Sequence, residues 1–129
     1  MAILCYTITT MKHIVVSALF LVTLLCLSVF IFEPSNLYFE TPWLDIPMHI
    51  LGGFGVASLA IAVALYGKQK LSLVQVLILY LCVTLAWELY EFIKDVLIHQ
   101  VSWNGWHDTL WDIINGALGT AIAFFIFKK

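Results

Sequence analysis

Residues 14–32, with the sequence IVVSALFLVTLLCLSVFIF, decide the fold. This stretch contains 19 residues and no charged side chain. A helix rises about 1.5 Å per residue, so the stretch is long enough to cross a bilayer hydrocarbon core about 30 Å thick. We therefore predict that it forms a transmembrane helix.

The start of the chain allows two interpretations of this first span. Lys12 precedes the apolar stretch, as a basic residue does in a secretory signal peptide. The stretch is longer than a usual signal-peptide core, however, and Phe32-Glu33-Pro34 follows it in place of a cleavage site of small residues. We expect an uncleaved anchor. Translation could start at Met1 or at Met11. Residues 1–12 are expected to form an N-terminal segment, of which residues 1–10 are loosely ordered.

Three further apolar runs follow the first, separated by turn sequences. The connectors are residues 33–36, residues 67–70 and an expected interfacial loop with aromatic anchors at residues 101–106. We predict spans over about residues 13–32, 44–66, 71–98 and 108–127. The runs are continuous rather than alternating and are too few to close a β-barrel. The predicted fold class is all-α, a four-helix transmembrane bundle that forms a single membrane domain over residues 13–129.

The composition excludes several classes of protein. Hydrophobic residues make up 63% of the chain and charged residues 11%, against about 45–50% and 25% in soluble domains. The formal net charge is −2 and all six basic residues are lysine, so we expect no nucleic-acid partner. The three cysteines show no metal-ligand spacing and are expected to pack as small apolar side chains. The expected partners are membrane lipids.

Lysines and acidic residues separate to opposite ends of the predicted bundle. If successive spans alternate in direction, all eight acidic residues lie at one end or in the half of the membrane beside it. Five lysines lie at the other end: Lys12, Lys68, Lys70, Lys128 and Lys129. By the positive-inside rule the lysine end is cytoplasmic, which predicts an N-in/C-in orientation. The expected location is a cell membrane that the chain crosses several times, a bacterial inner membrane.

Polar residues at helical spacing mark the acidic ends of three spans. They are Asp45 and His49 in the second span, Glu88, Glu91 and Asp95 in the third, and Asp108, Asp112 and Asn115 in the fourth. Residues three or four apart share one face of a helix. Because antiparallel threading brings the three groups to the same depth, we predict that they converge on one pocket.

These residues could hold a divalent metal ion. A charged group inside the bilayer is costly unless it is paired, hydrated or bound to an ion, and so indicates a functional site. Imidazole and carboxylate suit Zn²⁺, whereas Mg²⁺ or Mn²⁺ prefers oxygen ligands. We predict that the metal ligands are His49, Glu88 and Asp112. Asp45, Asp108 and Asn115 are predicted to orient these ligands, and Glu91 and His107 are the candidate general bases.

Structural explanations of the same residues also exist. Asp45 and Asp108 could cap the starts of their helices. Glu91, Lys94 and Asp95 could form a solvated face in which Lys94 pairs with the carboxylates of its own helix. The five tryptophans fall on the acidic side and are typical of an aromatic belt at the membrane interface.

Three short motifs in a fixed order resemble those of a known family. They are Asp45-x3-His49-x2-Gly52-Gly53-Phe54, Trp87-Glu88-x2-Glu91, and Asp108-Thr109-x2-Asp112 followed by Gly119. Over residues 43–124, three of the four spans, the chain resembles the YjdF-like (DUF2238) small integral membrane proteins and is more distantly similar to the VanZ-like family. The first resemblance implies a polar site at the Asp, His and Glu positions of the motifs but no known reaction. The second implies a role in the cell envelope and in glycopeptide resistance.

Three functions fit this sequence. The first is a metal-dependent hydrolase or transferase that acts on a lipid-linked ester or phosphate near the outer leaflet. The second is a non-catalytic accessory or scaffold protein in which the polar residues form an internal hydrogen-bond network. The third is a cation or proton pathway. The lysine-side halves of the spans offer almost nothing polar beyond Gln75, so a continuous pathway would require a homo-oligomer.

Overall fold

The computed structural model describes residues 2–98 and 105–128. Their elements, in order, are α1 (Ala2–Leu27), the π-helical turn η1 (Ser28–Phe32), α2 (Leu37–Glu40), the 3-10 turn η2 (Pro42–Leu44), α3 (Asp45–Tyr66), α4 (Leu73–Ile98) and α5 (Trp106–Phe127). The helices long and apolar enough to cross a membrane are Thr7–Phe32, Pro42–Tyr66, Leu73–Leu97 and Trp106–Phe127. No described residue forms a strand. The prediction of an all-α bundle with four spans is confirmed.

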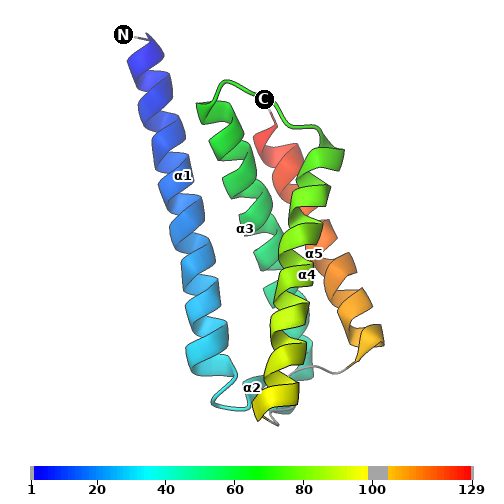
Figure 1. Cartoon of the computed structure of the whole chain (residues 1–129). Helices are drawn as coiled ribbons and strands as arrows, with labels where there is room; N and C mark the ends of the chain where they lie inside the picture. The colour runs from blue at the N-terminus through cyan, green and yellow to red at the C-terminus, as the bar shows by residue number, and fades with distance from the viewer. Residues whose placement is uncertain (1, 99–104, 129) are drawn as a thin grey trace.

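Helix α3 is the central helix of the bundle. It packs against α5, α1 and α4, and α4 also packs against α5. Both chain termini and the turn between α3 and α4 lie at one end of the bundle, whereas α2 lies at the other (Figure 1). We call these the terminal end and the α2 end. The start of α3, the finish of α4 and the start of α5 therefore meet at the α2 end, as antiparallel threading predicts.

The beginning and the connectors of the chain differ in part from the expectation. Helix α1 begins at Ala2, so residues 2–10 are part of the first helix instead of being loosely ordered. The sequence explains this, because no proline or glycine interrupts α1. The turn at residues 33–36 ends at Asn36, which has the left-handed φ of 54°. Residues 101–104 of the expected aromatic loop lie outside the described residues.

Helices α3 and α5 touch backbone to backbone because glycines line their contact. A Cβ atom at Gly53 would overlap the backbone of Gly116, and one at Gly119 would overlap the carbonyl of Ile50. The Thr120 hydroxyl donates a hydrogen bond to the Gly53 carbonyl at 3.1 Å. Small residues at a contact allow the close van der Waals packing that holds helices together in lipid. This contact fixes the rotation of α3 against α5.

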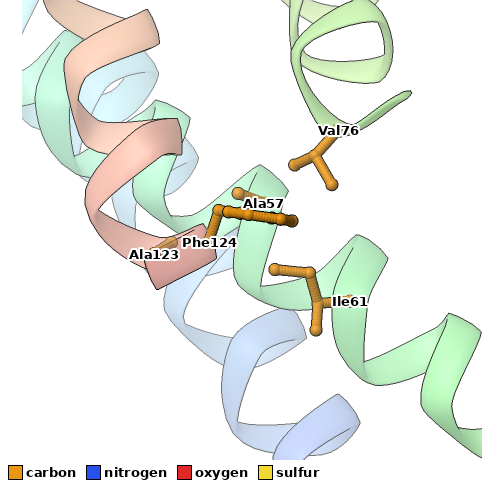
Figure 2. Close-up of a cluster of buried hydrophobic side chains, with 5 residues drawn as sticks. All are labelled: Ala57, Ile61, Val76, Ala123 and Phe124. Carbon is orange, nitrogen blue, oxygen red and sulfur yellow. The ribbon is translucent and has the colours of Figure 1, made fainter. Parts of the chain in front are cut away.

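The hydrophobic core and the polar contact between α1 and α3 lie closer to the terminal end. Figure 2 shows the hydrophobic core, a cluster contributed by three helices: Ala57, Ile61, Val76, Ala123 and Phe124. Helix α1 attaches to α3 through polar groups, because the Ser58 hydroxyl lies 2.8 Å from the Ser17 hydroxyl and 3.0 Å from His13 Nε2. Large apolar side chains of α1 and α4 remain exposed on the outside of the bundle. Such side chains are suited to contact lipid.

The sequence suggests that Lys94 pairs with the carboxylates of its own helix, but the structure shows a different partner. Its ammonium group binds the Glu33 carboxylate in the connector after α1, and both side chains are largely buried. Lys94 is three residues after Glu91 and could have paired with it along the helix, but its ammonium group lies against Glu33. The ion pair therefore ties the connector to α4.

The glycine contact predicts the effect of a single added methyl group. Gly53→Ala should lower the free energy of unfolding by about 1 to 3 kcal/mol, because the backbone of Gly116 cannot move aside as a flexible side chain would. Gly52→Ala is the matched control, since a Cβ there has no heavy atom within 4 Å. It should be neutral or stabilising by up to about 1 kcal/mol through helix propensity. Thermal unfolding of both variants in one detergent measures the difference, and equal midpoints would contradict the proposed packing.

The ion pair between Lys94 and Glu33 predicts a non-additive double-mutant cycle. Lys94→Met should destabilise the protein by about 3 to 5 kcal/mol, because it leaves the buried Glu33 carboxylate unpaired. The double variant Lys94→Met/Glu33→Gln should recover most of this loss. Unfolding of the two single variants, the double variant and the native protein gives the coupling energy. Additive effects would show that the pair contributes nothing to stability.

Candidate functional site

One histidine and two aspartates form a compact cluster at the α2 end. The His49 Nε2 atom lies 3.3 Å from Asp45 Oδ1 and 3.6 Å from Asp112 Oδ1. One ligand atom from each residue lies within 4.8 Å of the other two. Asp45 and His49 come from α3 and are four residues apart, so they share one face. Asp112 reaches them from α5, across the glycine contact.

The side chains of the cluster are buried inside the bundle and more exposed toward the α2 end. Fractional exposure of the side chain is 12% for His49 and 8% for Asp112, but 30% for Asp45. Asp45 is the first residue of α3, whereas Asp112 lies six residues into α5, at a depth of about 9 Å along the helix. A small molecule could therefore reach the cluster at the side of Asp45.

Tyr80 of α4 holds the backbone of α5 beside the cluster. Its hydroxyl donates to the carbonyl of Asp112 at 3.2 Å and to that of Ile113 at 3.0 Å. Its ring also packs against Gly116, where an added Cβ would overlap it. Tyr80 is buried. Sequence reasoning missed this residue, because an isolated tyrosine in an apolar run carries no spacing signal.

Glu88 lies outside the group of three ligand atoms, although the sequence predicts it as a metal ligand. The Thr109 hydroxyl donates to Glu88 Oε2 at 2.6 Å. Glu88 Oε1 is fully buried and has no hydrogen-bond partner among the described residues. Thr109 is three residues before Asp112, so Glu88 is held about one helical turn from the cluster. A buried carboxylate oxygen without a partner is costly in an apolar region.

Glu91 of α4 interacts with members of both groups. Its carboxyl is half-buried and interacts electrostatically with Glu88, His49, Asp45 and Asp112. The structure thus brings the acidic face of α4 to the cluster, as the converging stripes predict. Glu91 is near the cluster without being one of its three close members.

The remaining predicted residues are more peripheral. Asp108 lies in the first turn of α5 and interacts electrostatically with Asp112, and Asn115 is half-buried. His107 is exposed, with its ring centroid 6.4 Å from that of Trp111. Neither Asp45 nor Asp108 is a capping residue, because the N-caps of α3 and α5 are Leu44 and Gly105. The capping explanation of the two aspartates is therefore wrong.

Tyr38 of α2 is a second residue that sequence reasoning missed. Its hydroxyl lies 3.0 Å from the Ser28 hydroxyl. Burial, together with the charges of Asp45, Glu91 and Glu33, raises the pKa of Tyr38 to about 12. The phenol therefore stays protonated at neutral pH and can donate a hydrogen bond beside the acidic groups.

The cluster carries an excess of negative charge. It contains one imidazole and the carboxyl groups of Asp45 and Asp112, and Glu88 and Glu91 add two further carboxyl groups nearby. The Lys94 ammonium is already bound to Glu33. Like charges brought together in a poorly hydrated region repel one another, and a cation bound among these groups would compensate them.

Comparison with known proteins identifies a family for this chain. No curated protein and no solved structure matches the chain. Residues 1–129 match a family described as "Predicted membrane protein (DUF2238)". The match covers the whole chain, so it includes every residue of the cluster and confirms the resemblance to the YjdF-like proteins. The chain belongs to the DUF2238 family of predicted membrane proteins.

Proposed function

We propose that this protein is a membrane-embedded metalloprotein that binds a divalent ion at Asp45, His49 and Asp112. The observation that carries the proposal is the approach of three ligand atoms, one from each residue, to within 4.8 Å of one another. The excess of carboxylates around one imidazole supports it, because a divalent cation would compensate that charge.

The spacing of the ligand atoms suits zinc. Ligands about 2.0–2.2 Å from a zinc ion at tetrahedral angles lie about 3.3–3.6 Å from one another. The two distances from His49 Nε2 are 3.3 Å to Asp45 and 3.6 Å to Asp112. Imidazole also favours Zn²⁺ over Mg²⁺, while Mn²⁺ accepts the same donors. Asp45 thus takes the ligand role that the sequence predicts for Glu88.

Three protein ligands leave one position open, as in catalytic zinc sites. An ion held there would supply the Lewis acidity that polarises a phosphoryl or acyl oxygen. Glu91 would accept a proton from the attacking water and return it to the leaving alcohol oxygen as the bond to phosphorus or carbon breaks. We prefer Glu91 to His107 as the base, because Glu91 faces the three ligands whereas His107 is exposed.

The substrate class follows from the location of the cluster. The spans begin or end at the α2 end, so the cluster lies just inside the membrane, at the level where lipid headgroups meet acyl chains. Asp45 is its most exposed member, so a substrate would approach from the side of Asp45. We propose a lipid-linked ester or phosphate as the substrate and hydrolysis or transfer of its headgroup as the reaction.

A non-catalytic scaffold is the second candidate. It is favoured by the hydrogen bond from Thr109 to Glu88 and by the two ion pairs of His49, which together join α3, α4 and α5 without any ion. In that case the polar residues would define a single packing of the helices. The two candidates differ in whether the folded protein binds metal.

Metal content distinguishes them. Detergent-purified native protein should contain close to one Zn²⁺ or Mn²⁺ per chain, measured by elemental mass spectrometry. His49→Ala and Asp112→Asn should each remove most of it, since each deletes or weakens one of three ligands. Glu40→Gln is the control, because Glu40 is an exposed carboxylate at the same end. A folded native protein that stays metal-free after addition of Zn²⁺ and Mn²⁺ would refute the proposal and favour the scaffold.

Glu91→Gln separates the reaction from metal binding. Glu91 is proposed as the base and is not one of the three ligands, so this variant should keep its metal. It should hydrolyse lipid-linked phosphates or esters in mixed micelles roughly 100-fold more slowly than the native protein, or more slowly still. Glu40→Gln should hydrolyse them at the native rate. Equal activity of the native protein and Glu91→Gln would remove Glu91 from the mechanism.

A further inference from the structure

A cavity lies at the terminal end, on the opposite side of the bundle from the cluster. It has a volume of about 330 Å³ and lies between α3, the turn before α4 and the end of α5. Its lining includes Ile61, Leu65, Gln69, Lys70, Phe124 and Lys128. The volume falls within the range of about 300–1,000 Å³ that is common for small-molecule sites.

The cavity has an apolar wall and a positively charged rim. Ile61 and Phe124 belong to the hydrophobic core in Figure 2, and Leu65 packs against that core. Lys70 and Lys128 are both exposed. The Lys128 ammonium lies 5.5 Å from the ring centroid of Phe124, so it stays close to the apolar wall. The ligand that matches this arrangement is anionic at one end and apolar at the other.

No acidic side chain lies near these lysines in the sequence. No Asp or Glu occurs at positions 1–32, at positions 46–87 or after Asp112. These segments include all of α1 and almost all of α3, most of α4 and the C-terminal part of α5. An external anion is therefore the natural partner of the rim.

We propose that the cavity binds one anionic phospholipid of the surrounding leaflet. The phosphate lies between the ammonium groups of Lys70 and Lys128, and Gln69 can donate to it from its amide. The first part of an acyl chain lies against Leu65, Ile61 and Phe124. A free phosphate ion would leave that wall unused, and a zwitterionic lipid would bring its own cation to the positive rim. Basic pockets between transmembrane helices recognise lipid headgroups on this principle.

This inference does not rest on the proposed function. The cavity shares no residue with the cluster of Asp45, His49 and Asp112. The lipid site and the metal site can therefore be present or absent independently of each other, and metal content does not decide the lipid test.

Native mass spectrometry of the full chain tests the proposal. The detergent-solubilised protein is titrated with phosphatidylglycerol and, separately, with phosphatidylcholine. The test variant is Lys70→Gln/Lys128→Gln. The matched control is Lys12→Gln/Lys68→Gln, which removes two exposed lysines from the same end without altering the lining of the cavity. Thermal unfolding confirms that both double variants are folded.

We expect the native protein to bind one phosphatidylglycerol in preference to phosphatidylcholine. The test variant should bind it roughly 30-fold more weakly, because each lysine beside an anionic lipid contributes about 1 kcal/mol. The control should show only a small fraction of that loss, and millimolar inorganic phosphate should not displace the lipid. Equal weakening in both variants would show diffuse attraction only. Displacement by inorganic phosphate would show a simple anion site, and equal binding of the two lipids would also overturn the proposal.

Discussion

The close approach of α3 to α5 is the constraint on which the rest of the structure depends. In lipid, apolar surface alone gives little drive for helices to associate, so the association relies on close van der Waals contact. Gly53, Gly116 and Gly119 provide that contact because they let one backbone touch the other. The same contact sets the rotation of the two helices, and so turns His49 toward Asp112 instead of toward lipid.

The two ends of the bundle differ in electrical character. At the α2 end, buried carboxyl groups outnumber the imidazole, and the buried Lys94 is already paired with Glu33. At the terminal end, lysines surround an apolar cavity and the adjoining segments contain no acid. A bundle polarised in this way suits a cation at one end and an anionic headgroup at the other, with the hydrophobic core of Ala57, Ile61 and Phe124 nearer the terminal end.

The sequence predicts the fold well and the site only in part. The spans follow from the length of continuous apolar runs, and the meeting of the polar stripes follows from their spacing and from antiparallel threading. Spacing within one helix shows which residues share a face, but it does not predict how that helix is rotated about its axis relative to its neighbours. For this reason it places Asp45 beside His49 on one helix but could not show how far Glu88 of α4 lies from His49. The sequence could not predict the partner of Lys94 or the role of Tyr80 for the same reason, because both depend on contacts between segments that are distant in sequence.

The order of the helices has a consequence for biosynthesis. Helix α3 leaves the ribosome before α5, so His49 enters the membrane with Asp45 as its neighbour while Asp112 has still to be made. During that interval the polar face of α3 lacks its partner helix. The cluster is completed only by the last described span, so its assembly waits for the insertion of α5.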